Sequence, residues 1–178
     1  MTYSPVTIAN YFIQKSIDEK DLISPMKLQK LIYFAHGWHL ALRNEPLITD
    51  AIQAWQFGPV IKDLYHKTKH WGNSSITSLL PPQEVIDFSK GTLGIESLDK
   101  ETISFLDSVW STYAPYSAIK LSNATHVDGS PWDQVIKRNG GVDLELVIEN
   151  TIIQKYFKER AEAARQTKVR QTAANDQL

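Results

Sequence analysis

Two pairs of histidines come closest to a chemical site in this sequence. His36 and His39 are three residues apart, and His66 and His70 are four apart. Both spacings place two imidazoles on one face of a helix, and imidazole nitrogens are common ligands of zinc and other transition metals. No carboxylate stands inside either pair, and lysines alternate with the second pair. We therefore expect no metal and no cofactor, and keep a His-ligated metalloenzyme only as an alternative.

Motifs for nucleophilic and phosphate chemistry are absent. The chain has no cysteine, which excludes a thiolate nucleophile, a disulfide and cysteine-ligated metal centres. It has no Gly-x-Ser-x-Gly turn, which positions a catalytic serine, and neither of the glycine-rich motifs that bind nucleotide phosphates. We therefore expect that this protein is not an enzyme and acts through binding.

The distribution of charge gives little support for nucleic acid as a partner. Lys62, Lys67, Lys69 and His70 lie close together, and residues 158–170 carry more basic than acidic side chains. The formal net charge of −1 nevertheless provides no overall attraction for a polyanion. We expect no nucleic-acid partner, and a nucleic-acid-associated regulatory protein stays an alternative.

Apolar and aromatic residues favour a protein with a packed core. Hydrophobic residues make up 42% of the 178 residues, but no apolar run is long enough to span a bilayer. The N-terminal segment MTYSPVTIANYF lacks the basic and apolar regions of a secretion signal. We expect a cytoplasmic protein with no membrane partner. Most of its five tryptophans and seven tyrosines should be buried in the core. The surplus of such rings favours a binding module, because they dominate protein–protein contacts.

Ser-Pro pairs predict where helices begin. A serine caps the free amides of a first helical turn, and a following proline has no amide to leave unpaired. Such pairs occur at Pro5, Pro25 and Pro131. The first two helices would cover residues 5–17 and 25–42. In the second, large apolar residues and rings surround the axis, which is typical of a helix enclosed on more than one side.

Between these helices and the C-terminus the pattern changes several times. PLI and IQAWQF, separated by Thr49-Asp50, predict a small β-hairpin over about residues 46–57. Pro59 would begin a helix that ends at Gly72, and an irregular loop would follow. The final core helix would begin near residue 142 and end at Phe157. The prediction is a mainly α, single compact helical domain with this hairpin and a helical or frayed C-terminal tail.

Several motifs, in order along the chain, resemble the Panacea domain family of SocA-like antitoxins and phage-associated GepA-like proteins. They are KLQKL, WQFGP and ATHVDGSPW with their surroundings, from about Pro5 to Phe157. The residues that carry the resemblance are Lys27, Gln29, Trp38, Trp55, Phe57, Gly58, Pro59, His126, Pro131 and Trp132. We expect these residues to determine the fold rather than to contact a partner.

The resemblance implies an antitoxin-like protein that neutralises a cognate toxin by direct protein–protein binding. Some members deliver the toxin to a ClpXP-type protease. Residues 1–157 would form the Panacea-like antitoxin domain, and residues 158–178 a charged extension, partly helical or disordered. The nucleic-acid alternative would then be a regulatory protein of a phage or mobile element. We predict that exposed residues of the second and third helices contact the partner, together with the loop from Asn73 to Gly94. These residues are Lys30, Tyr33, Lys62, Tyr65, His66 and Lys69.

Overall fold

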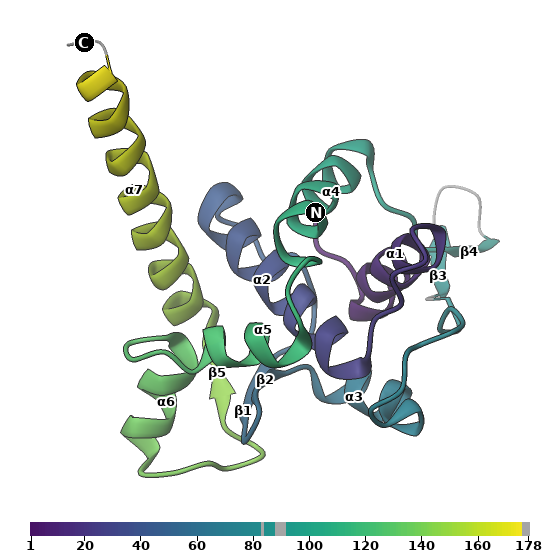
Figure 1. Ribbon diagram of the computed structural model, residues 1–178. Helices are drawn as coiled ribbons and strands as arrows, with labels where there is room; N and C mark the ends of the chain where they lie inside the picture. The colour runs from purple at the N-terminus through teal and green to yellow at the C-terminus, as the bar shows by residue number, and fades with distance from the viewer. Residues whose placement is uncertain (83, 88–91, 176–178) are drawn as a thin grey trace.

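A computed structural model describes residues 1–82, 84–87 and 92–175 of the protein. Helix α2 (Pro25–Arg43) lies at the centre of a mainly α-helical fold (Figure 1). The helices that pack against it are α1 (Pro5–Asp18), α3 (Lys62–Thr68), α4 (Lys100–Tyr113), α5 (Ala118–Thr125) and α7 (Asn150–Asn175). Residues 28–37 of α2 are buried without interruption, which confirms that this helix is enclosed on more than one side.

The predicted helix starts at the Ser-Pro pairs are confirmed. Helices α1, α2 and α6 (Pro131–Asn139) each begin at the proline. The hydroxyl of the preceding serine accepts a hydrogen bond from an amide of the first turn in each case. Local capping chemistry therefore sets these three boundaries.

The β-hairpin exists, but it lies later in the chain than predicted. Strand β1 (Ile52–Trp55) pairs with β2 (Gly58–Val60) in antiparallel fashion around a turn at residues 56–57. The predicted turn at Thr49-Asp50 is wrong, because the backbone there pairs with Tyr3 instead. Pro59 lies within β2, an edge strand, where its missing amide is tolerated. Helix α3 (Lys62–Thr68) therefore begins later than Pro59, and the short 3₁₀-helix η1 (Lys69–Trp71) ends it at Gly72.

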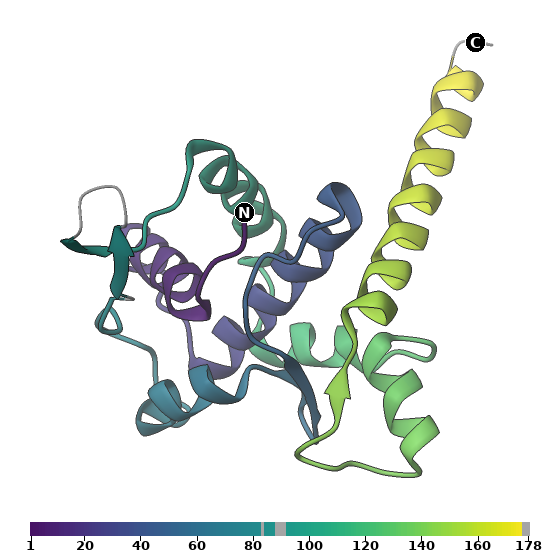
Figure 2. The same ribbon diagram turned by 180° about the vertical axis from the view of Figure 1, so that it is seen from behind.

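The start of the last helix was also predicted wrongly. Strand β5 (Val147–Ile148) pairs with β1, which gives the sheet order β2-β1-β5. The expected helix from residue 142 is thus a loop and a strand, and Leu144 is 56% exposed rather than inward. Helix α7 begins only at Asn150, continues through the predicted extension to Asn175, and projects away from the body (Figures 1 and 2).

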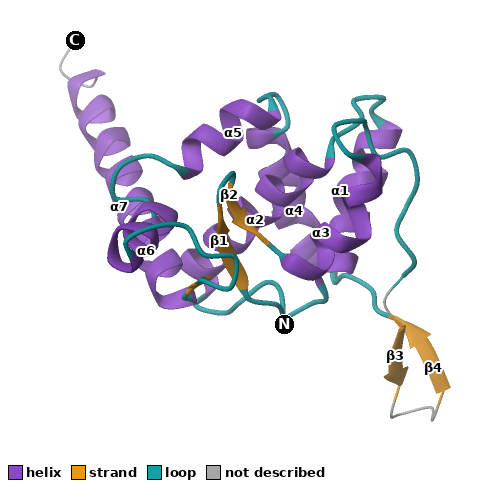
Figure 3. Ribbon diagram, turned by 90° about the horizontal axis from the view of Figure 1, so that it is seen from below, coloured by secondary structure: helices purple, strands orange, loops and turns teal. Residues whose placement is uncertain are grey.

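A second hairpin occupies part of the predicted irregular loop. Strands β3 (Glu84–Asp87) and β4 (Thr92–Ile95) pair with each other and stand apart from the helices (Figure 3). Part of the loop that we predict to contact a partner, at residues 83 and 88–91, lies outside the described residues.

Aromatic rings fix α7 against the centre of α2. The ring of Phe157 lies 5.1 Å from that of Trp38 and 5.9 Å from that of Tyr33. A Cβ atom on Gly37 would come within 2.3 Å of the Phe157 ring, so the helices approach this closely only because residue 37 is glycine. The Trp38 Nε1–H donates to the Tyr113 hydroxyl at 2.7 Å. The rings of α2 thus belong mainly to the core. Within the described ranges, no helix combines the length and the apolar character needed to cross a bilayer.

Candidate functional site

Two neighbouring side chains of α2 hold the second strand of the β1–β2 hairpin. The Gln29 amide pairs with the peptide groups of Ile61: its Oε1 accepts from the Ile61 N–H at 2.9 Å, and its Nε2–H donates to the Ile61 carbonyl at 3.2 Å. The Lys30 Nζ donates to the Pro59 carbonyl at 3.0 Å. These bonds attach β2 and the residue that follows it to α2.

The turn of this hairpin is held from its other side by α5 and α6. Each backbone carbonyl of residues 55–57 lies within hydrogen-bond distance of a different side chain. In chain order these are the Trp132 Nε1–H, which donates at 2.7 Å, the His126 Nε2 at 3.3 Å, and the Ser122 hydroxyl, which donates at 3.1 Å. The rings of His126 and Trp132 also pack together, with centroids 4.1 Å apart. We call these five side chains the hairpin clamp, because together they fix the backbone from Trp55 to Ile61. They are Gln29, Lys30, Ser122, His126 and Trp132.

Gly58 lies where the two sides of the hairpin clamp meet. Its φ of +95° is in the region that favours glycine. A Cβ atom at this position would lie 2.5 Å from the Thr125 Oγ1 and 2.8 Å from the Lys30 Nζ. The structure thus brings several of the residues that carry the Panacea resemblance together around a single hairpin, although they are far apart in the sequence.

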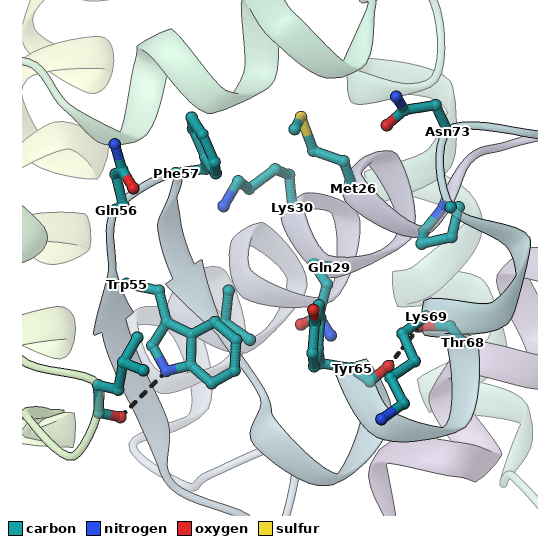
Figure 4. Close-up of a pocket in the computed structure, with 14 residues that line it drawn as sticks. Met26, Gln29, Lys30, Trp55, Gln56, Phe57, Tyr65, Thr68, Lys69 and Asn73 are labelled. Atoms are coloured by element: carbon teal, nitrogen blue, oxygen red, sulfur yellow. Dashed lines mark hydrogen bonds between the residues drawn. The ribbon is translucent and has the colours of Figure 1, made fainter.

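A groove of about 400 Å³ opens beside the clamped hairpin (Figure 4). It lies between the first turns of α2, the hairpin turn and the end of α3, and its walls are mostly apolar. The residues that define it here are Met26, Lys30, Trp55, Phe57, Val60 and Tyr65. The Phe57 side chain is 63% exposed and that of Tyr65 is 38% exposed. The Trp55 ring packs edge-on against Tyr65 at 4.9 Å and its Nε1–H donates to the Leu144 carbonyl at 3.1 Å.

Lys30 gives the floor of the groove an unusual charge. The residue is only 1% exposed, and among the described residues no carboxylate oxygen lies within 4.0 Å of its Nζ. Burial therefore lowers the pKa of the Lys30 ammonium to about 7. Lys27, three positions before Lys30 on the same helix, has a different environment. Its Nζ lies 3.9 Å from the Asp21 carboxylate and donates to the Ala114 carbonyl.

The predicted partner-contact residues fall into two groups. Lys62, Tyr65, His66 and Lys69 are exposed, and Tyr65 and Lys69 line the groove. Lys62 lies to one side, where its Nζ pairs with the Glu145 carboxylate at 2.7 Å. That these four residues contact a partner stays a prediction.

The expectation that Lys30 and Tyr33 are exposed is wrong. They are 1% and 2% exposed, because the hairpin and α7 cover the sides of α2 on which they lie. Lys30 still reaches the floor of the groove, whereas Tyr33 packs against Phe157 inside the core.

The first histidine pair connects α2 to neighbouring segments. The His36 Nε2–H donates to the Asn150 Oδ1 at 2.9 Å, its Nδ1 accepts from the Ile48 amide at 3.4 Å, and burial lowers the pKa of His36 to about 4. The His39 Nδ1–H donates to the Glu45 carbonyl at 2.7 Å, and burial lowers the His39 pKa as well. Within the described residues, no three or more histidine and carboxylate side chains gather as a metal site would require.

Sequence reasoning missed two features of this site. It did not single out Ser122, which lies two residues before the ATHVDGSPW motif. A signal existed there, since a run of small polar residues on a short helix often binds backbone groups. It also placed Lys30 outside the apolar face. The ring-rich pattern that indicated an enclosed helix could have predicted that this lysine is buried.

Comparisons with known proteins identify the family of this chain. Residues 28–133, from the middle of the KLQKL motif to the start of α6, match the family described as "Antitoxin SocA-like, Panacea domain". The matched segment contains the whole hairpin clamp. The chain is 30% identical over 153 residues to antitoxin SocA of Caulobacter vibrioides (strain NA1000 / CB15N), covering 86% of this chain and 79% of that protein. No solved structure matches the chain significantly. The chain therefore belongs to the antitoxin SocA-like family, whose members share the Panacea domain.

Proposed function

We propose that this protein is an antitoxin that binds a cognate protein toxin directly and neutralises it, with the groove forming part of the contact surface. Membership of the family supports the general role, since the relative from Caulobacter vibrioides is named an antitoxin. Neutralisation by covering a surface requires no bond-making chemistry from this chain.

The observation that carries the proposal is the exposure of Phe57 on a fixed turn. The Phe57 side chain is 63% exposed, while the backbone around it is held by the hairpin clamp. A large apolar ring in solvent contributes nothing to the core, and a fixed backbone reduces the entropy lost when a partner binds it. Aromatic anchors of this kind dominate protein–protein contacts.

Co-expression with the product of the neighbouring gene tests the proposal. We expect the wild-type protein to restore growth that the toxin arrests and to co-purify with the toxin. Phe57→Ala should weaken the complex by about 2 kcal/mol or more, which is at least about 30-fold in Kd. Ile119→Ala is the matched control, because Ile119 is 70% exposed on α5 and lies outside the groove. A complex that tolerates Phe57→Ala as well as Ile119→Ala would place the contact elsewhere.

The proposal includes a second step, in which the bound toxin is delivered to a ClpXP-type protease, as the resemblance implies for some members. Delivery predicts that the toxin has a short half-life in cells that contain both this protein and the ClpX unfoldase. Removing either one should lengthen the half-life. A half-life that does not depend on ClpX would mean that neutralisation occurs by occlusion alone.

A further inference from the structure

The floor of the groove carries a cation that the described part of the fold does not neutralise. The ammonium group of Lys30 has three N–H donors, and the structure uses one of them, on the Pro59 carbonyl. Its nitrogen lies on the side of the groove formed by Gln56 and Phe57 (Figure 4). A charge buried in this way is costly unless a partner supplies the opposite charge.

The walls around this cation restrict what could bind it. Met26, Trp55, Phe57 and Val60 line the groove with apolar surface. An occupant must therefore combine an apolar group, which covers these walls, with an anionic oxygen that reaches the Lys30 Nζ. A carboxylate next to a large apolar side chain has both properties.

We propose that the groove receives a segment of a partner protein in which an aspartate or glutamate side chain accepts a hydrogen bond from Lys30 Nζ. A neighbouring large apolar side chain of the same segment packs against Phe57 and Trp55. This inference rests on the proposed function in one respect, since the segment would belong to the neutralised toxin.

An acidic side chain fits the site better than the carboxylate at a chain end. Terminal carboxylates are usually bound by several converging backbone amides. The backbone group next to the Lys30 Nζ is the Pro59 carbonyl, and Pro59 has no amide to donate. A single buried lysine at the floor of the groove instead suits a single carboxylate that apolar contacts hold in place.

Selection of short random peptides displayed on phage tests the proposal on this protein alone, without the toxin. The peptides are fused through their C-terminal ends to the coat protein, so that none has a free terminal carboxylate. On the wild-type protein we expect enrichment of Asp or Glu beside Trp, Phe or Leu. Lys30→Met should abolish the acidic preference but keep the apolar one. Lys27→Met is the matched control, because Lys27 also donates to a backbone carbonyl but does not line the groove.

Synthetic peptides then give a quantitative result on the unmodified protein. The best selected peptide, with an amidated C-terminus, should bind the wild-type protein about 10-fold or more tightly than its Asn or Gln analogue. The acidic peptide and its Asn or Gln analogue should bind the Lys30→Met variant with equal affinity. Because the first comparison changes only the peptide, it holds even if Lys30→Met folds poorly, which circular dichroism would reveal.

Several results would overturn the inference. These are a failure to select any peptide, a selection without acidic residues, or an acidic preference that survives Lys30→Met. If a peptide that has no acidic side chain but a free terminal carboxylate bound as tightly as the selected acidic peptide, the assignment to a side-chain carboxylate would be wrong. Co-purification of the toxin separates the two proposals: a toxin that binds wild type and Lys30→Met equally contradicts only the inference, and a toxin that binds neither contradicts the proposed function.

Discussion

Gln29 holds the peptide groups of Ile61 with both ends of its amide, as a neighbouring strand would. We expect Gln29→Ala to lower the free energy of unfolding by about 1–3 kcal/mol, because it leaves the Ile61 amide without its partner. The Ile61 carbonyl still accepts from the Tyr65 amide. Urea denaturation measures this change. Gln14→Ala, on the exposed face of α1, should cost less than about 0.5 kcal/mol. Equal losses in the two variants would contradict the role of Gln29.

Lys30 makes stability depend on pH in a defined window. Burial lowers its pKa from 10.5 to about 7, so between these values the unfolded chain binds a proton that the folded chain does not. The free energy of unfolding therefore rises with pH through this window. Below about pH 7 we expect Lys30→Met to be more stable than wild type by about 1–4 kcal/mol, with a smaller difference toward pH 10.

Urea denaturation of wild type and Lys30→Met at matched pH values measures this difference, and the other titrating groups cancel in the comparison. A difference that stays constant from pH 6 to pH 10 would contradict a lowered lysine pKa.

The β1–β2 hairpin depends on a glycine that two other elements approach closely. Gly58→Ala would combine an unfavourable φ with a clash against Thr125 Oγ1 at 2.5 Å, and we expect a loss of about 3 kcal/mol or more. Gly129→Ala provides a control, because Gly129 has a φ of +74° but no atom near its absent Cβ. It should cost about 1 kcal/mol. Thermal unfolding distinguishes the two, and similar losses would mean that the close approach is unimportant.

Elements that local chemistry determines were predictable from the sequence. The three Ser-Pro pairs predicted helix starts because the cap and the first turn lie within a few residues of each other. The hairpin was displaced because its register depends on distant donors, namely the hairpin clamp residues of α2, α5 and α6. The start of α7 was wrong for a similar reason, since β5 pairs with β1 almost a hundred residues earlier in the chain.

Across the whole molecule, a buried ring helps to attach α7 to the body, together with the buried Ile153 and the hydrogen bond between His36 and Asn150. Phe157 is buried against Gly37, Tyr33 and Trp38. We expect Phe157→Ala to lower the free energy of unfolding by about 3–5 kcal/mol, through lost burial and the cavity that remains. Arg160→Ala, one turn further along the same helix and exposed, should change it by less than about 0.5 kcal/mol. Denaturant titrations of both proteins provide the test, and a small effect of Phe157→Ala would mean that other contacts hold α7.

The candidate site was predictable only in part. The family motifs directed attention to residues that do converge in space, including Gln29, Gly58, His126 and Trp132. The groove itself was not predicted, because it arises where α2, the hairpin and α3 meet. No local pattern encodes the shape of such a junction. The sequence also did not reveal which aromatic rings are exposed, because the chain contains many rings and most of them pack in the core.

In the hairpin turn, the backbone and the side chains have different roles. The backbone of residues 55–57 is fixed by the hairpin clamp, while the Phe57 ring faces solvent. The Phe57 ring is therefore free of the packing constraint that folding places on its neighbours. Because Phe57 belongs to a motif that carries the family resemblance, under the proposed function this ring would be an anchor that members share, and differences between their targets would arise at other exposed positions around an unchanged scaffold.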